Sequence, residues 1–177
     1  MLRIILTYGI IAGLIVAIPM FALLAANPDP NSYATSQFFG YALMILALSM
    51  IFVGVKSYRD KIKGGVIKFL PAFLIGLGIS CVAGIVYVVG WEITLHLTDY
   101  AFASDYAAAS LEAARAKGAS PADLEAMTAE FAEFEAMYAN PLVRLPMTFI
   151  EIFPVGLIIS LIAAAFLRNP RFFPARG

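Results

Sequence analysis

The chain has 177 residues, 62% of them hydrophobic and only 14% charged, and its 12 basic residues balance 12 acidic ones. Soluble domains contain roughly 45–50% apolar and about 25% charged residues, so this composition argues against an ordinary soluble or disordered protein. The apolar residues fall in four blocks of 18 or more, each long enough to cross a bilayer. The single cysteine, Cys81, excludes an intrachain disulfide. We therefore expect an all-α integral membrane protein with four transmembrane helices, whose partner is the lipid bilayer and not nucleic acid.

The first block covers residues 4–26 and contains no charge. A signal peptide has a shorter apolar region of about 7–15 residues, so we predict a retained span. Residues 27–32 follow as a turn-rich exit, because proline and asparagine do not continue a helix well. The second block, residues 38–55, leads into a basic loop with a glycine turn. We expect the basic side chains of this loop to contact anionic lipid headgroups: Lys56, Arg59, Lys61, Lys63 and Lys68.

The third block covers residues 69–91, and its helical pattern continues to residue 97. Such a helix is about 43 Å long at 1.5 Å per residue. A hydrocarbon core is about 30 Å thick, so this helix is expected to tilt or to project into water. The fourth block, residues 145–167, contains one charged residue, Glu151.

The basic residues are distributed unevenly along the chain. Nine of the 12 lie at the amino end, in the loop of residues 56–68 and in the carboxyl tail, whereas the remaining segments hold only Arg115, Lys117 and Arg144. Cytoplasmic loops of membrane proteins collect lysine and arginine. The distribution therefore predicts that both termini are cytoplasmic and that the first and third loops lie outside.

The outer loop between spans three and four, residues 98–140, is alanine-rich and acidic. Gly118 suits the end of one helix, because glycine adopts the left-handed conformation easily. Ser120 suits the cap of the next helix, with Pro121 at its first position and Asp123 as a capping carboxylate. We predict helices over residues 102–117 and 121–138 that pack as an outer hairpin. The whole chain, residues 1–177, is then one four-span membrane domain with residues 98–140 as an inserted hairpin.

Small residues recur at every fourth position in three of the spans. Such rows allow helix backbones to approach closely inside a membrane. They indicate either packing within the bundle or a face for another subunit, and the sequence does not separate these alternatives. The rows are Gly9 and Gly13, then Gly76, Ser80 and Gly84, and finally Gly156, Ser160 and Ala164.

Three ionisable side chains within or beside the spans are candidates for a polar membrane site. Glu92 and His96 are four residues apart and therefore share one helical face. At that spacing they can form a stabilising surface pair, relay a proton or solute, or supply two metal ligands. Because Glu92 is expected near the outer interface beside Trp91, the surface pair is the simplest interpretation, and we expect no metal site.

The third ionisable side chain, Glu151, lies about 25 Å from the inner face, in the outer third of the membrane. A carboxylate at the centre of a membrane helix costs roughly 2.5–3.5 kcal/mol on insertion scales. Pro154 follows one turn later and predicts a kink. Glu151 can therefore either line a cavity or form a buried structural hydrogen bond. The outer-half groups that can supply this bond are Tyr41, Tyr87, Trp91 and Thr148, and Arg144 can reach inward along the same helix.

The sequence contains no phosphate-binding loop, no nucleophile elbow and no metalloprotease motif. A single histidine also excludes most histidine-dependent triads or metal centres on one subunit. We therefore predict no catalytic residues and no cofactor, and we favour a protein that is not an enzyme.

Three segments carry a resemblance to a known family. They are residues 40–60, which include Tyr58-Arg59-Asp60, residues 64–92, which end in Trp91-Glu92, and residues 149–157, which contain a Glu-x-x-Pro-Val-Gly motif. Together they resemble the bacterial membrane family catalogued as domain of unknown function 4199. The resemblance implies an integral protein of the bacterial inner membrane, and it implies no reaction. In that membrane, the outer hairpin predicted from the basic residues is periplasmic.

Two functional hypotheses follow from these features. The first is a non-enzymatic structural or partner-binding membrane protein, whose outer hairpin contacts a protein partner or a second copy of the chain. The alternative is a small oligomeric transporter or proton-linked carrier that uses Glu151, with Glu92 and His96 at its outer mouth. A folded amphipathic hairpin on spans that carry little chemistry favours the first hypothesis.

Overall fold

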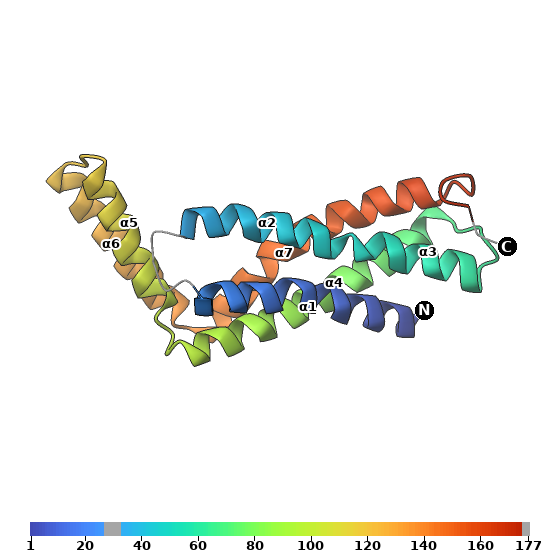
Figure 1. The fold of residues 1–177 in the computed structure, drawn as a ribbon, viewed down its shortest axis with the longest axis horizontal. Helices are drawn as coiled ribbons and strands as arrows, with labels where there is room; N and C mark the ends of the chain where they lie inside the picture. The colour runs from blue at the N-terminus through green and yellow to red at the C-terminus, as the bar shows by residue number, and fades with distance from the viewer. Residues whose placement is uncertain (27–32, 175–177) are drawn as a thin grey trace.

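The structure is a computed structural model that describes residues 1–26 and 33–174 of the chain. Its described part is helical, with a long bundle and a short helical hairpin that projects from one end (Figure 1). The helices are α1 (Leu2–Ala26), α2 (Tyr33–Leu48), α3 (Met50–Ile62), α4 (Phe69–Leu97), α5 (Phe102–Ala116), α6 (Pro121–Tyr138) and α7 (Pro141–Leu167).

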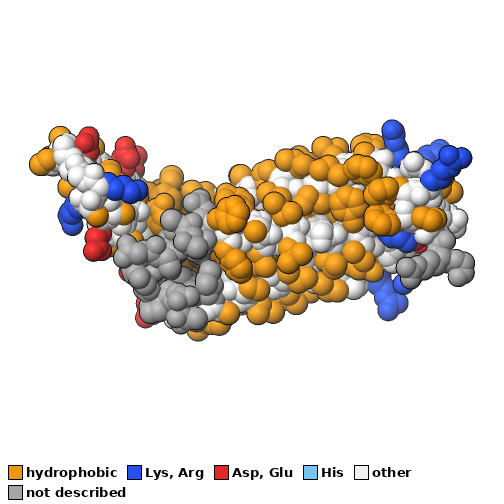
Figure 2. Space-filling view, turned by 45° about the horizontal axis from the view of Figure 1, so that its top comes forward, with side chains coloured by type: hydrophobic (Ala, Val, Ile, Leu, Met, Phe, Trp, Pro, Cys, Tyr) orange, Lys and Arg blue, Asp and Glu red, His pale blue; other side chains and the backbone are white. Residues whose placement is uncertain are grey.

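Within the described residues, four helical stretches are long and apolar enough to cross a membrane: Leu2–Ala22, Phe38–Ile62, Phe69–Leu97 and Pro141–Leu167. Hydrophobic side chains cover the surface of the shaft that they form (Figure 2). Helix length and hydropathy thus confirm a multi-pass membrane protein. The hairpin of α5 and α6 lies between spans three and four, as the sequence predicts.

Two of these spans differ from their predicted limits. The second extends to Ile62, beyond its first charged residues, because lysine and arginine are good helix formers. It also consists of two helices that meet at Ser49, whose hydroxyl donates to the Leu46 carbonyl at 2.6 Å. The fourth begins at Pro141, where the Asn140 side chain accepts from a backbone N–H as an N-cap.

The glycine row of α1 packs against α4. A Cβ atom placed on Gly9 would lie 2.5 Å from Cβ of Val82, and one on Gly13 would lie 2.5 Å from Cβ of Val86. Both distances are shorter than real side chains tolerate, so the two backbones approach as closely as glycine allows. This row therefore serves packing within the bundle.

The small-residue rows of α4 and α7 pack against each other in the same way. A Cβ atom on Gly76 would lie 2.9 Å from Cβ of Ser160, and one on Gly156 would overlap Oγ of Ser80. Ser80 and Ser160 are both buried at this contact. The structure thus settles the alternative that the sequence left open, because the rows face other helices of the same chain.

The hairpin has the predicted start and stop signals. Gly118 adopts a positive φ of 82° after α5, and Ser120 and Asp123 form a reciprocal capping box at the start of α6. The rings of Tyr106 and Phe131 meet edge to face at 6.1 Å between the two helices. No residue of α6, all of which the structure describes, is buried. The hairpin therefore presents most of its surface to the surroundings.

Charge is separated along the molecule. Basic side chains gather at the end of the shaft away from the hairpin, and acidic ones gather on the hairpin (Figure 2). The amino end of α1 and the carboxyl end of α7 lie together at the basic end (Figure 1).

Candidate functional site

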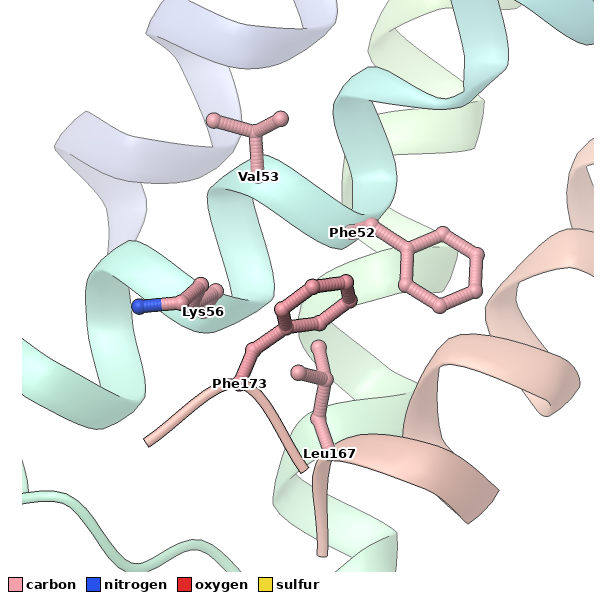
Figure 3. A pocket seen from close by; sticks show the side chains of 5 residues that line it. All are labelled: Phe52, Val53, Lys56, Leu167 and Phe173. Atoms are coloured by element: carbon pink, nitrogen blue, oxygen red, sulfur yellow. The ribbon is translucent and has the colours of Figure 1, made fainter. Parts of the chain in front are cut away.

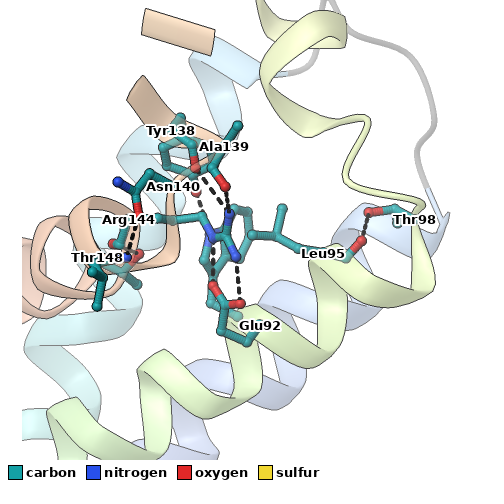
Figure 4. A network of polar contacts seen from close by, with 10 residues as sticks. Glu92, Leu95, Thr98, Tyr138, Ala139, Asn140, Arg144 and Thr148 are labelled. Atoms are coloured by element: carbon teal, nitrogen blue, oxygen red, sulfur yellow. Dashed lines mark hydrogen bonds and ion pairs between the residues drawn. The ribbon is translucent and has the colours of Figure 1, made fainter. Parts of the chain in front are cut away.

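The most elaborate polar cluster joins the bundle to the hairpin and is centred on Arg144, in the first turns of α7. Its Nε donates to Oε1 of Glu92 on α4 at 2.7 Å, and its Nη2 donates to Oε2 of the same carboxylate at 2.8 Å (Figure 4). The Arg144 side chain is only 4% exposed, and that of Glu92 is 26% exposed. Paired hydrogen bonds of this kind are among the strongest that side chains form. They fix spans three and four to each other at the ends that lie next to the hairpin.

The same guanidinium also binds the end of the hairpin. Nη1 of Arg144 donates to the carbonyl oxygen of Tyr138 at 3.0 Å and to that of Ala139 at 3.4 Å. The last carbonyls of a helix have no partner within it and carry partial negative charge. Arg144 therefore links α4, α6 and α7 through one side chain.

Aromatic side chains surround this guanidinium. Its carbon lies 5.1 Å from the centre of the Tyr100 ring and 5.7 Å from that of the Tyr138 ring. The Tyr138 hydroxyl accepts a hydrogen bond from Nε1 of Trp91 at 2.7 Å. Burial raises the pKa of the Tyr138 phenol above its ordinary value, so this hydroxyl stays protonated at neutral pH.

The chain between α4 and α5 adopts an unusual conformation at this cluster. Asp99 and Tyr100 have positive φ values of 50° and 57°, and non-glycine residues in this region cost roughly 1–3 kcal/mol each. The Tyr100 N–H donates to the Leu95 carbonyl at 2.8 Å, and its ring lies over Arg144. These contacts hold the strained turn in place and set the direction in which the hairpin leaves the bundle.

Glu92 and His96 both belong to the continuous helix α4 and therefore share one of its faces, but the contacts of the two side chains differ. Glu92 binds Arg144, as described above, whereas the ring of His96 lies 6.3 Å from that of Tyr100. In the part of the chain that the structure describes, no group of three histidine, cysteine, aspartate or glutamate side chains is arranged to hold a metal ion.

Glu151 lies in a second, smaller polar contact, in the half of α7 that is nearer to the hairpin. The hydroxyl of Tyr87 on α4 donates to its Oε2 at 3.2 Å. Tyr87 is buried, whereas Glu151 is exposed on the outer surface of α7. Tyr41, another suggested partner, lies on α2 with an exposed side chain. The hydrogen bond to Tyr87, which is one of those that the sequence suggested, is thus present.

Arg59, at the opposite end of the bundle, has a structural role that the sequence did not reveal. Its guanidinium is fully buried. Nε donates to Asp60 at 2.7 Å, Nη1 donates to the Phe172 carbonyl at 2.9 Å, and Nη2 donates to the Phe173 carbonyl. Arg59 therefore holds the carboxyl tail against α3.

The other basic residues of the 56–68 segment are placed differently from Arg59. Lys61, Lys63 and Lys68 are exposed, and Lys56 is partly exposed and forms an ion pair with Asp60. In the sequence, only the Tyr58-Arg59-Asp60 motif distinguishes Arg59 from the four lysines of this segment. All five residues are basic and strongly hydrophilic, so charge and hydropathy do not predict which one is buried.

The family described as "Protein of unknown function (DUF4199)" matches residues 7–169, and the chain belongs to this family. The matched range includes Arg59, Glu92, Arg144 and Glu151. No curated protein and no solved structure matches the chain.

Proposed function

We propose that this member of the DUF4199 family is a non-enzymatic membrane protein whose outer hairpin binds a protein partner. The observation that carries the proposal is the attachment of the hairpin by Arg144, which binds Glu92 in the bundle and two carbonyls at the end of α6. A hairpin held in one direction presents a pre-organised surface, and pre-organisation lowers the entropy cost of binding.

The distribution of charge supports the orientation of this surface. Of the 11 basic residues that the structure describes, eight belong to the end that holds the amino end of α1 and the carboxyl end of α7. By the positive-inside rule this end is cytoplasmic. In the bacterial inner membrane that the family resemblance implies, the hairpin then projects into the periplasm.

The charge of the hairpin favours a particular class of partner. Residues 98–140 contain eight acidic and two basic residues, a net charge of −6. Two hairpins of this charge repel each other, so a protein with a basic surface is a better partner than a second copy. The exposed acidic side chains of α6 provide the matching surface: Glu125, Glu130, Glu133 and Glu135.

Site-specific photocrosslinking in cells tests this proposal. A photoreactive amino acid at Glu133, on the hairpin, is expected to yield a defined protein adduct. The same group at Leu74, which is exposed on the bundle surface, serves as the lipid-facing control. Replacing Glu125 and Glu130 with lysine should diminish the adduct. The absence of any protein adduct from exposed hairpin positions would contradict the proposal.

A second candidate function rests on the hydrogen bond between Tyr87 and Glu151. A carboxylate within a membrane-spanning segment is costly, and such residues mark many proton and ion pathways. A small oligomeric, proton-linked carrier could use Glu151 at such a position. Because the Glu92 carboxylate forms an ion pair with Arg144, proton transport would depend mainly on Glu151.

A further inference from the structure

A shallow hollow of about 210 Å³ opens on the surface of the bundle at its basic end (Figure 3). Its floor is the side chain of Leu167, which is 1% exposed, and its rim includes Val53 and Phe173, which are 43% and 61% exposed. The hollow therefore faces outward from the last turns of the spans. Its lining residues come from α3, from the end of α7 and from the tail: Phe52, Val53, Lys56, Leu167 and Phe173.

Phe173, which forms one side of the hollow, is held in place by hydrogen bonds to the backbone of the tail. Phe173 has a positive φ of 49°, a conformation that is rare for a bulky residue. The buried guanidinium of Arg59 donates to the carbonyls of Phe172 and Phe173. The tail is thus fixed in a bent conformation, with the Phe173 ring beside α3.

The apolar lining of the hollow favours a hydrocarbon chain over water or a polar ligand. A bound water needs two to four polar partners, whereas four of the five lining residues are apolar and the stem of Lys56 is aliphatic. The volume is below the roughly 300–1,000 Å³ of pockets for compact small molecules. A linear chain that lies partly in the hollow and partly in the bilayer suits this shape.

The charges near the rim select an anionic headgroup. The Lys56 side chain is 35% exposed beside Asp60, and Arg168 and Arg171 are exposed in the adjoining tail. Basic residues therefore outnumber acidic ones around the opening. A phosphate at the membrane surface is attracted to such a group.

The structure assigns this hollow to one acyl chain of an anionic phospholipid, whose phosphate lies against Lys56. The site is independent of the proposed binding function of the hairpin, which lies at the opposite end of the molecule (Figure 1). It gives the basic segment a specific lipid contact in addition to the general attraction of its exposed lysines.

Native mass spectrometry of the full-length protein, with phosphatidylglycerol or phosphatidylcholine of identical chains added, tests this assignment. The parent should retain one phosphatidylglycerol in preference to phosphatidylcholine. Val53→Trp fills the hollow and should abolish retention. Lys56→Gln should lower phosphatidylglycerol binding about fivefold, the equivalent of about 1 kcal/mol per basic residue, and Lys56→Arg should restore it.

Matched controls separate the site from general effects. Leu70→Trp places the same ring at another exposed position near the basic end, and Lys63→Gln removes an exposed lysine that does not line the hollow. Both should retain the lipid like the parent. Equal retention of the two lipids, unchanged retention in Val53→Trp, equal loss in the controls, or a dimer mass in place of bound lipid would each overturn the assignment.

Discussion

Arg144 and Glu92 lie 52 residues apart in the chain and meet through two hydrogen bonds of 2.7 and 2.8 Å. The pair sits where α4 and α7 meet the hairpin, and the guanidinium binds the end of α6 as well. The orientation of the hairpin therefore depends on a contact between residues that neither hydropathy nor helix periodicity connects.

Glu92→Ala is expected to destabilise the protein strongly. Removing one partner of a buried ion pair leaves an uncompensated charge and typically costs about 3–5 kcal/mol. Thermal unfolding in detergent measures the effect, with Glu125→Ala on the exposed surface of α6 as the control. The double variant Glu92→Leu/Arg144→Met should be more stable than Glu92→Ala. An unchanged melting temperature in Glu92→Ala would show that the pair does not support the fold.

Gly156→Ala is expected to disrupt the contact between α4 and α7. The new methyl group would overlap Oγ of Ser80, and overpacking of this kind costs typically about 1–3 kcal/mol. Ser80→Gly in the same chain should recover part of the loss. Gly40→Ala provides the control, because a Cβ there would meet Met20 at an ordinary 3.6 Å. Equal melting temperatures for both alanine variants would be inconsistent with the observed packing.

Arg59→Met is expected to release the carboxyl tail. The carbonyls of Phe172 and Phe173 lose their donor, and hydrogen bonds to charged groups contribute about 1.5–3 kcal/mol. Limited proteolysis of the tail should become faster than in the parent, while Lys61→Met, at an exposed site, should leave it unchanged. Equal cleavage rates in Arg59→Met and the parent would exclude this role of Arg59.

Substitutions at Glu151 separate anchoring from transport. If the Tyr87 hydrogen bond only anchors the helices, Tyr87→Phe and Glu151→Leu should each lower stability by about 1 kcal/mol. Glu151→Gln keeps the acceptor oxygen and should preserve both stability and function. Melting temperature and a growth phenotype of the deletion strain provide the readouts. A Glu151→Leu variant as stable as the parent would end the anchoring interpretation, and loss of function in a stable Glu151→Gln variant would favour the carrier.

Much of the fold follows from local signals in the sequence. The spans are set by hydropathy, and the hairpin is set by Gly118, Ser120, Pro121 and Asp123, whose effects act within a few residues. The carboxyl end of the second span was harder to predict from hydropathy, because the helix continues through Lys56 and Arg59 despite their charge.

The polar contacts at both ends of the bundle could be predicted only in part. The helical spacing predicts that Glu92 and His96 share one face of a helix, but it does not reveal Arg144, which binds Glu92 as a charged, bidentate partner from another helix. Arg59 was grouped with lysines of the same segment, although its planar guanidinium can bind several carbonyls at once. Which residues pair over such long distances in the chain depends on the tertiary fold, and a single sequence does not reveal these pairs.

The attachment of the hairpin is the central claim and can be measured by the distance between two spin labels. The labels are placed by cysteine substitution at Thr128 on α6 and Leu74 on α4, in a chain that carries Cys81→Ala. The parent should give one narrow distance distribution, and Glu92→Gln, which weakens the pair with Arg144, should give a broader one. A broad distribution in the parent, or an equally narrow one in Glu92→Gln, would contradict the claim that this ion pair fixes the hairpin to the membrane bundle.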